Sequence, residues 1–366
     1  MATKKQKNSK VDDVIQEIGI ESQEKKGKTE TAAEQIKEEV NQNSKKEEFS
    51  LRDLPGVGSK MADTLKEHGF HTPMSIAMAS VSSLEALDGI SELTAGRIID
   101  AAKEHLDMGI KTANEFMKDH ATRGFLTTNS KALDQMMGGG IEQGVLTEFF
   151  GDFGSGKTQI AEECAVTVQL LLDRGGLNGK CIYVDAEGSF RPERIKQMAV
   201  ALGLDPNKVL ENIFVARAYN IDFQLAFNSK IREMIDVQHE PIKLVVIDSL
   251  TTHFRSEYTG RGTLADRQQT LNKYLHELII YAEQYGLVII GTNQVMANPG
   301  MMFGDPTTPI GGHILGHASK YRVYLRKGRE GKRVAKLIDA PHLPDAEVVF
   351  MVDETGVHDF DEKNKK

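Results

Sequence analysis

Eight consecutive residues near the middle of the chain have the types and spacing needed to bind the phosphates of a nucleotide. They match the pattern Gly-x-x-x-x-Gly-Lys-Ser/Thr and are, in order, Gly151, Asp152, Phe153, Gly154, Ser155, Gly156, Lys157 and Thr158. In such a loop backbone N–H groups converge on an anion, the lysine reaches the β- and γ-phosphates, and the threonine hydroxyl ligates Mg²⁺. A chance match in a glycine-rich turn arises in roughly one chain of this length per hundred. We therefore predict a site for a nucleoside triphosphate and Mg²⁺.

Three polar residues further along could act on the bound nucleotide. Asp248 closes a very apolar run and is the expected acid that holds Mg²⁺, directly or through water. Glu187 is the candidate that positions the attacking water, and Gln294 the candidate that contacts the γ-phosphate. The alternatives are a turn former at the end of a strand for Asp248 and an ordinary loop carboxylate for Glu187. We interpret Glu187, Lys157 and Gln294 as the catalytic residues of an ATPase.

The elements that must position these residues alternate between strand and helix patterns. Strands are predicted at 145–150, 180–185, 213–216, 243–249 and 287–294, and helices at 159–172, 193–202, 223–237 and 265–285. This alternation predicts an α/β fold with a mainly parallel sheet. In such sheets ligands bind beyond the carboxyl ends of the strands, where Glu187, Asp248 and Gln294 all fall. The phosphate loop and these three residues should therefore share one rim.

Two segments without a periodic pattern leave the same rim, at 253–262 and 295–312. The first combines arginine and aromatic residues with glycines, which suits binding of nucleic-acid strands, and the second is rich in glycine and proline. A predicted hairpin at 320–336 has a basic tip at 327–329. A solvated turn is the default interpretation of that tip, and DNA contact is the alternative.

A duplicated pattern precedes the core. Residues 54–65 and 87–98 each read as a tight turn followed by a helix, with Gly56 and Gly58 in the first copy and Gly89 and Ser91 in the second. This predicts a small all-α domain with glycines where φ must be positive. The first copy resembles the helix-hairpin-helix module, whose turn offers backbone N–H groups to a DNA phosphate without reading bases. The alternative is a packed helical domain that mediates protein contacts.

Composition sets outer limits on the function. The 366 residues suffice for one large or two smaller domains, and residues 1–48 are polar enough to predict disorder. The net charge of −8 argues weakly against nucleic acid but permits a local basic groove. The two cysteines have no metal-binding spacing and are expected to be buried thiols. No secretory signal or membrane span is predicted, so we expect a cytoplasmic protein.

Several motifs together resemble those of the RecA-family DNA strand-exchange recombinases, especially the archaeal and eukaryotic members. The similarity runs from about Leu51 to Asp359. The motifs are Gly-Asp-Phe-Gly-Ser-Gly-Lys-Thr-Gln at 151–159, Asp-Ala-Glu-Gly-Ser-Phe-Arg-Pro-Glu-Arg at 185–194, Tyr-Thr-Gly-Arg-Gly at 258–262, Thr-Asn-Gln-Val at 292–295, Pro-Ile-Gly-Gly at 309–312 and Tyr-Leu-Arg-Lys-Gly at 324–328.

This resemblance implies a DNA repair and homologous recombination protein. Such a protein binds ATP and Mg²⁺, forms filaments or rings, assembles on single-stranded DNA and exchanges strands with a homologous double-stranded DNA. It implies a disordered tail at 1–48, a helix-hairpin-helix domain at 49–105, a linker at 106–122, a RecA-like P-loop core at 123–360 and a charged tail at 361–366. A ring helicase of the same fold and a paralogue that loads another recombinase are the alternatives.

The resemblance also assigns roles to individual residues. Arg194 would stack on adenine, and Asp339 and Pro341 would cover the nucleotide of a neighbouring subunit. The implied DNA-binding residues are Arg255, Tyr258, Arg261, Gly56, Gly58, Gly311 and Gly312. The family docks a Phe-x-x-Ala tether into the next subunit, and here Ile110 and Ala113 occupy the tether positions. Because isoleucine buries less area than phenylalanine, we expect weaker docking or a reshaped pocket.

Overall fold

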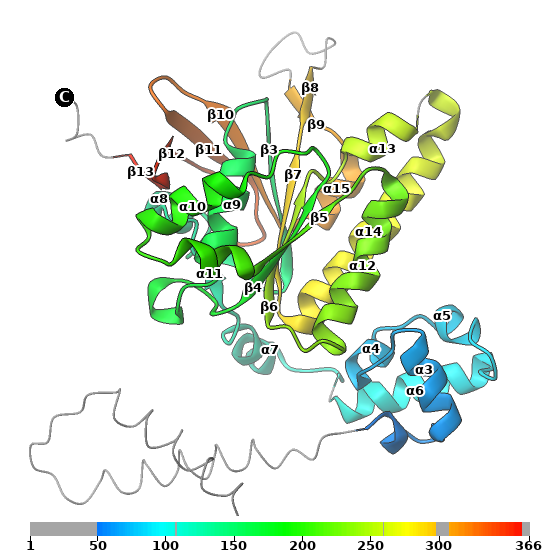
Figure 1. Ribbon diagram of the computed structural model, residues 1–366. Coiled ribbons are helices and arrows are strands. Elements are labelled where there is room, and N and C mark those ends of the chain that lie inside the picture. Colours follow the sequence, from blue (N-terminus) through cyan, green and yellow to red (C-terminus); the bar gives the residue numbers. More distant parts are fainter. Residues whose placement is uncertain (1–49, 107, 259, 298–306, 361–366) are drawn as a thin grey trace, which may run out of the picture. The chain divides into compact units, whose positions relative to one another are not determined.

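The computed structural model describes residues 50–106, 108–258, 260–297 and 307–360 (Figure 1). The chain divides into Met1–Ser50 and Leu51–Lys366, and all elements given below belong to the second unit. The predicted tails at 1–48 and 361–366 lie outside the described residues.

A compact set of short helices forms the N-terminal part of the described chain. Its elements are η1 (Leu51–Asp53), α3 (Ser59–Glu67), α4 (Pro73–Ala77), α5 (Val81–Glu85) and α6 (Glu92–His105). Each α-helix buries at least one aliphatic side chain: Leu65, Ile76, Leu84 and Ile98 are fully buried. Since burial of such a side chain is worth roughly 1.5–3 kcal/mol, these contacts hold the short helices together.

The two predicted copies have the same backbone geometry at their turns. Gly56 and Gly89 both have positive φ, at +87° and +83°, so the prediction is confirmed for this pair. Gly58 instead has a φ of −77° and precedes α3 as its N-cap. Ser91 fills the equivalent place before α6, where its side chain accepts a hydrogen bond from the Thr94 N–H. The change from glycine to serine therefore preserves the helix start.

A connection with one helix, α7 (Ala113–His120), follows the small domain. Ile110, at the first predicted tether position, is fully exposed, and Ala113 begins α7. Beyond it the short strands β1 (Phe125–Leu126) and β2 (Ile141–Glu142) pair antiparallel on either side of α8 (Lys131–Met136). The tether itself stays a prediction.

One sheet of nine strands organises the described core, in the order β13-β12-β11-β10-β3-β7-β6-β4-β5. Its parallel part consists of β3 (Val145–Gly151), β4 (Lys180–Asp185), β5 (Ile213–Arg217), β6 (Ile242–Asp248), β7 (Val288–Asn293) and β10 (Tyr321–Lys327). Its antiparallel part adds β11 (Lys332–Asp339), β12 (Ala346–Asp353) and β13 (Gly356–Asp359). The predicted α/β fold with a mainly parallel sheet is confirmed.

Helices cover both faces of this sheet (Figure 1). On one face, α9 (Lys157–Thr167), α10 (Pro192–Ala201) and α11 (Pro206–Glu211) share an apolar cluster with Tyr183 and Val246. On the other, α12 (Ile221–Asp236), α14 (Leu264–Tyr285) and α15 (Gly312–Ala318) pack around Val184 and Ile247. Because neighbouring strand residues point to opposite faces, the apolar runs at 180–185 and 242–248 supply both clusters.

Three predicted segments differ from the structure. The helix after the phosphate loop ends at Thr167, and the last apolar residues of the predicted helix lead into the short η2 (Leu172–Arg174). The segment 253–262 is not an irregular loop, since it contains most of α13 (Thr252–Glu257) and part of η3 (Arg261–Thr263). The segment 295–312 contains β8 (Val295–Ala297) paired antiparallel with β9 (Thr307–Pro309), and residues 298–306 lie outside the described part. Glycines in the first segment, and glycines and prolines in the second, led to the prediction of loops where short regular elements are present.

Both cysteines are free and buried, as predicted. Burial raises the pKa of the Cys181 thiol and so keeps it protonated. Every helix in the described ranges is too short or too polar to cross a membrane. The cytoplasmic location stays a prediction.

Candidate nucleotide site

The phosphate loop connects β3 to α9, which places it at the carboxyl edge of the parallel strands. Gly151 has a φ of +156°, and a side chain there would place its Cβ 2.2 Å from the Leu325 carbonyl oxygen on β10. Only glycine permits this close approach of the two backbones. The loop is thus anchored to the neighbouring strand before it turns into the helix.

Lys157 is the first residue of α9, and its side chain folds back over the loop. Its Nζ donates hydrogen bonds to the carbonyl oxygens of Gly151 at 2.8 Å and Asp152 at 2.9 Å. Burial lowers the pKa of this amine, while the carboxylates of Glu187 and Asp248 oppose that shift. A cation held this way, with no carboxylate in direct contact among the described residues, is ready to exchange its carbonyl contacts for phosphate oxygens.

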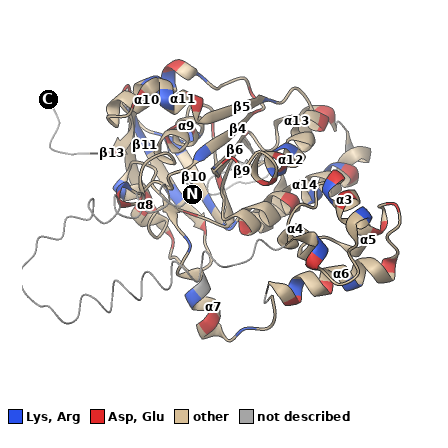
Figure 2. Ribbon diagram, turned by 60° about the horizontal axis from the view of Figure 1, so that its bottom comes forward, with Lys and Arg blue, Asp and Glu red and all other residues tan. Residues whose placement is uncertain are grey.

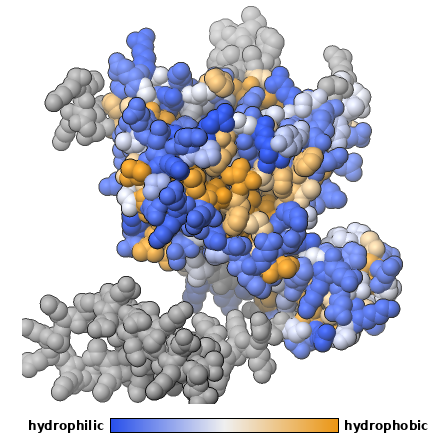
Figure 3. Space-filling model, in the orientation of Figure 1, coloured by the Kyte–Doolittle hydropathy of each residue, from blue (hydrophilic) through white to orange (hydrophobic). Residues whose placement is uncertain are grey.

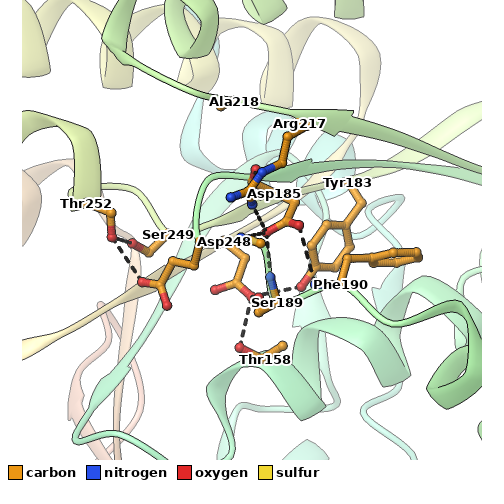
Figure 4. A network of polar contacts seen from close by, with 12 residues as sticks. Thr158, Tyr183, Asp185, Ser189, Phe190, Arg217, Ala218, Asp248, Ser249 and Thr252 are labelled. Carbon is orange, nitrogen blue, oxygen red and sulfur yellow. Dashed lines mark hydrogen bonds and ion pairs between the residues drawn. The ribbon is translucent and has the colours of Figure 1, made fainter.

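Asp248 lies at the end of β6 in the centre of a cluster of hydroxyl groups (Figure 4). Its Oδ2 accepts hydrogen bonds from Thr158 Oγ1 and Tyr183 OH, both at 2.9 Å, and from Ser189 Oγ at 3.0 Å. Its Oδ1 accepts one from Thr292 Oγ1. Burial raises the pKa of Asp248, and these hydrogen bonds counteract the rise.

The loop that carries Glu187 is fixed by the last residue of β4. Asp185 accepts hydrogen bonds from the Gly188 and Ser189 N–H groups at 2.7 Å and 3.0 Å and forms an ion pair with Arg217 at 3.1 Å. Glu187 itself joins two other segments, because its Oε1 accepts hydrogen bonds from Gln294 Nε2 at 2.9 Å and Thr252 Oγ1 at 3.0 Å. The carboxylate is therefore held at the rim by residues on either side.

A cavity of about 530 Å³ collects these residues around the phosphate loop. It is lined by Gly151, Asp152, Phe153, Gly154, Gly156, Lys157, Thr158, Gln159, Glu187, Ser189, Gln294, Val295 and Arg333. Asp248 does not line the cavity itself but accepts a hydrogen bond from Thr158, which does. The structure thus brings together the predicted catalytic residues, the loop and the predicted magnesium ligands. A threonine hydroxyl beside a buried carboxylate is an oxygen donor set that suits Mg²⁺.

Arg194 lies on α10 beside this cavity but does not line it. Its Nε donates to Gln159 Oε1 at 2.7 Å, its Nη1 to the Glu354 carbonyl oxygen at 2.8 Å, and its Nη2 to the Asp353 carbonyl oxygen. The edge of the guanidinium plane is therefore tied to α9 and to the β12–β13 turn. Asp339 and Pro341 are exposed and do not line the cavity of their own chain.

The predicted DNA-binding residues are spread over several elements. Arg255 is exposed on α13, and the Tyr258 hydroxyl contacts Thr270 Oγ1. The Arg261 side chain lies outside the described part, whereas Gly311 and Gly312 precede and begin α15 with positive φ. Acidic and basic residues are interspersed on α3 and α6 of the helical domain, which contains Gly56 and Gly58 (Figure 2). Their DNA contacts stay predictions.

Five residues at the site were missed from the sequence: Tyr183, Ser189, Thr252, Thr292 and Arg333. Ser189 lies in the motif at 185–194 and Thr292 in the motif at 292–295, so both could have been predicted as hydroxyl groups near strand ends. Tyr183 lies inside an apolar strand, where an aromatic residue predicts core. No local signal marks Thr252 or Arg333, since each reaches the site through the pairing of distant strands.

Comparison with known proteins identifies related families and relatives. Residues 123–360 match the family model described as Rad51, and residues 49–104 match the SAM-like helix-hairpin-helix tandem. The DNA repair and recombination protein RadA of Metallosphaera sedula is 50% identical over 318 residues, covering 87% of this chain and 98% of that protein. The protein of the same name from Aeropyrum pernix is 49% identical over 315 residues, covering 86% and 98%.

Proposed function

Because the chain belongs to the Rad51 family, we propose that it assembles on single-stranded DNA as an ATP-dependent filament and exchanges strands with a homologous duplex. Family membership makes it a DNA-dependent ATPase that acts in DNA repair and recombination. Its helix-hairpin-helix domain supports DNA binding that does not depend on base sequence.

The residues around the phosphate loop have complementary roles in ATP hydrolysis. The loop N–H groups and the Lys157 amine bind the phosphates, while Thr158 and Asp248 would hold Mg²⁺, which neutralises charge on the phosphate oxygens. Glu187 orients a water molecule toward the γ-phosphate, and its hydrogen bonds to Gln294 and Thr252 fix the direction of its carboxylate. Arg194 offers the face of its guanidinium to adenine, since its edge is already bonded.

The double hydrogen bond to Glu187 carries the proposal that ATP and DNA influence one another. Gln294 immediately precedes β8, and Thr252 is the first residue of α13. These are the starting points of the two segments proposed to bind DNA. A change at the γ-phosphate that moves Glu187 would shift both segments, and DNA that orders them would hold Glu187 in position.

An open edge of the core supports self-association. Among the described strands, β5 has only β4 as a neighbour in the sheet, and Val215, Tyr219 and Phe223 near this edge are exposed. Apolar surface is visible near the middle of the core in Figure 3. Unpaired strand edges with exposed apolar residues readily accept a strand from another chain. The exposed Ile110 is the tether side chain proposed to dock into the core of the neighbouring copy.

The test combines the rate of ATP hydrolysis with the shape of the assemblies seen by electron microscopy. We expect single-stranded DNA to stimulate ATP hydrolysis, and electron microscopy with DNA and a non-hydrolysable ATP analogue to show helical filaments. ATP binding without DNA stimulation or filaments would indicate a regulatory paralogue. Closed rings that unwind a forked duplex would indicate a helicase, and either result would overturn the proposal.

A further inference from the structure

Arg333 enters the wall of the nucleotide cavity from the antiparallel part of the sheet. It lies on β11, where it pairs with Lys327 of β10, just beyond the register at which Leu325 of β10 meets Gly151. Ala335 and Leu337 alternate with it along the strand and are buried in the cluster that contains α9. Arg333 therefore points to the face of the sheet that carries α9 and the phosphate loop.

The stem of this side chain lies against the loop itself. A Cβ added to Gly156 would lie 3.6 Å from Arg333 Cγ and 3.8 Å from its Nε. Gly156 immediately precedes Lys157, and both line the cavity together with Arg333. Two cationic side chains, one from α9 and one from β11, thus lie beside the same residue of the loop.

Within the described ranges the Arg333 guanidinium has only backbone partners. Its Nη1 donates to the carbonyl oxygens of Gly331 at 3.1 Å and Lys332 at 2.9 Å, whereas its buried Nε has no hydrogen-bond partner. Burial lowers the pKa of this side chain. A partly buried charge with an unused donor loses hydration without gaining a counterion.

Four other arginines of the core are paired with carboxylates, whereas Arg174, Arg191 and Arg194 donate to carbonyl or amide oxygens. Arg123, Arg217, Arg322 and Arg326 contact Glu142, Asp185, Glu148 and Glu347, respectively. Arg333 has no such ion pair in the described part of the chain, although its side chain is partly buried. Its missing counterion is accounted for if an anion enters the cavity that it lines.

We propose that Arg333 binds the phosphate chain of the nucleotide in its own subunit, as a second cation beside Lys157. The inference rests on the proposed function of the cavity as a nucleotide site. A guanidinium forms charge-assisted hydrogen bonds with phosphate oxygens, and its Nε and terminal nitrogens can donate together. Binding would satisfy the buried Nε and neutralise the side chain in one contact.

The first test compares nucleotide affinities of Arg333→Gln, Arg333→Lys and the wild type, measured by competition with a fluorescent ATP analogue. A lost charged hydrogen bond predicts that Arg333→Gln binds ATP and ADP between about 10-fold and 100-fold more weakly, with adenosine affinity unchanged. Arg333→Lys should recover part of the loss because it keeps the charge. The matched control is Arg329→Gln, which removes an exposed arginine from the tip of the same hairpin.

Equal ATP affinity in Arg333→Gln and wild type would overturn the inference, as would equal losses for ATP and adenosine, since the latter indicate a structural role. A wild-type protein that binds no ATP would instead refute the proposed function. A second measurement avoids substitution. Phenylglyoxal should modify Arg333 of the wild type, as read by mass spectrometry, and ATP but not adenosine should protect it while Arg329 stays reactive. Equal modification of Arg333 with and without ATP would also overturn the inference.

Discussion

The parallel and antiparallel parts of the sheet contribute to the nucleotide site in different ways. The parallel strands β3, β4, β6 and β7 each end at the same rim, and a polar group follows or closes each of them. The antiparallel strands β11, β12 and β13 run in alternating directions, and they contribute Arg333 near a strand start and the carbonyl oxygens of Asp353 and Glu354 at a turn.

This difference has a topological cause. Parallel strands connected by helices place every carboxyl end on one edge, so residues at successive strand ends converge. An antiparallel hairpin brings only alternate strand ends to that edge, and its contribution depends on the register of pairing. The parallel part therefore holds the groups proposed for chemistry, while the antiparallel part binds Arg194 and supplies the wall proposed to position the nucleotide.

The largest effect is expected from a substitution that removes Lys157, the cation at the phosphate loop of the parallel part. Lys157→Ala should reduce ATP hydrolysis and ATP-dependent strand exchange roughly 10²- to 10³-fold, because no other lysine of the described residues lines the cavity. The fold should persist, since the partners of Lys157 Nζ in the described part of the chain are two carbonyl oxygens of its own loop. Strand exchange and circular dichroism measure the two effects, with the exposed Lys131→Ala as control. Full strand exchange by Lys157→Ala would disprove the proposal that the parallel part holds the groups for chemistry.

The attachment of the antiparallel part to α9 should depend on pH. Glu163 on α9 accepts hydrogen bonds from the Val357 N–H of β13 and from Asn129 Nδ2, and burial raises its pKa from 4.5 to about 7. Because the folded pKa exceeds the unfolded one, the stabilisation is complete below about pH 4.5 and is lost as the pH rises through about 7.

Glu163→Gln removes this titration. Relative to the wild type, its free energy of unfolding should increase by roughly 2.5 kcal/mol between pH 5 and pH 8. Urea denaturation at both pH values measures the change, which is independent of any constant penalty from the amide. Glu193→Gln, at an exposed position of α10, should show no such change. If the difference in unfolding free energy between Glu163→Gln and the wild type stays constant with pH, burial does not shift the pKa of Glu163.

A smaller effect is expected for the link between Glu187 and α13. Thr252→Val removes one hydrogen bond to Glu187 and leaves Gln294 in place. Stimulation of ATP hydrolysis by single-stranded DNA should fall roughly two- to tenfold, with a smaller change in the rate without DNA. Ser256→Ala, on the same helix, loses only a bond to the His253 carbonyl oxygen and is the control. Equal reductions with and without DNA would show that Thr252 does not transmit the signal.

The smallest expected effect concerns the β12–β13 turn. Asp353 accepts hydrogen bonds from the Thr355 N–H and from His358 Nε2, and its carbonyl oxygen accepts from Arg194. Asp353→Asn should loosen the turn and weaken ATP binding by about threefold through Arg194. Titration with a fluorescent ATP analogue measures it, against the exposed Asp345→Asn. An unchanged ATP affinity would show that, within the antiparallel part, Arg333 alone contributes to nucleotide binding.

Much of the site could be predicted because its signals are local. The phosphate loop, Glu187, Asp248 and Gln294 each stand next to a recognisable strand pattern, and that pattern alone locates them on the rim. The helix after the loop was predicted too long, because its apolar spacing continues through the turn that follows Thr167. Local spacing cannot distinguish a helix from an apolar turn packed on the core.

By itself, the sequence determined which strands end in polar groups and therefore that one edge of a parallel sheet binds a nucleotide. Only the tertiary structure decided that Thr252 reaches Glu187 and that Arg333 reaches the loop beside Gly156. Both contacts join residues far apart in the chain, and they depend on strand order and register. These are set by the packing of all strands and helices together, so no short stretch of residues encodes them.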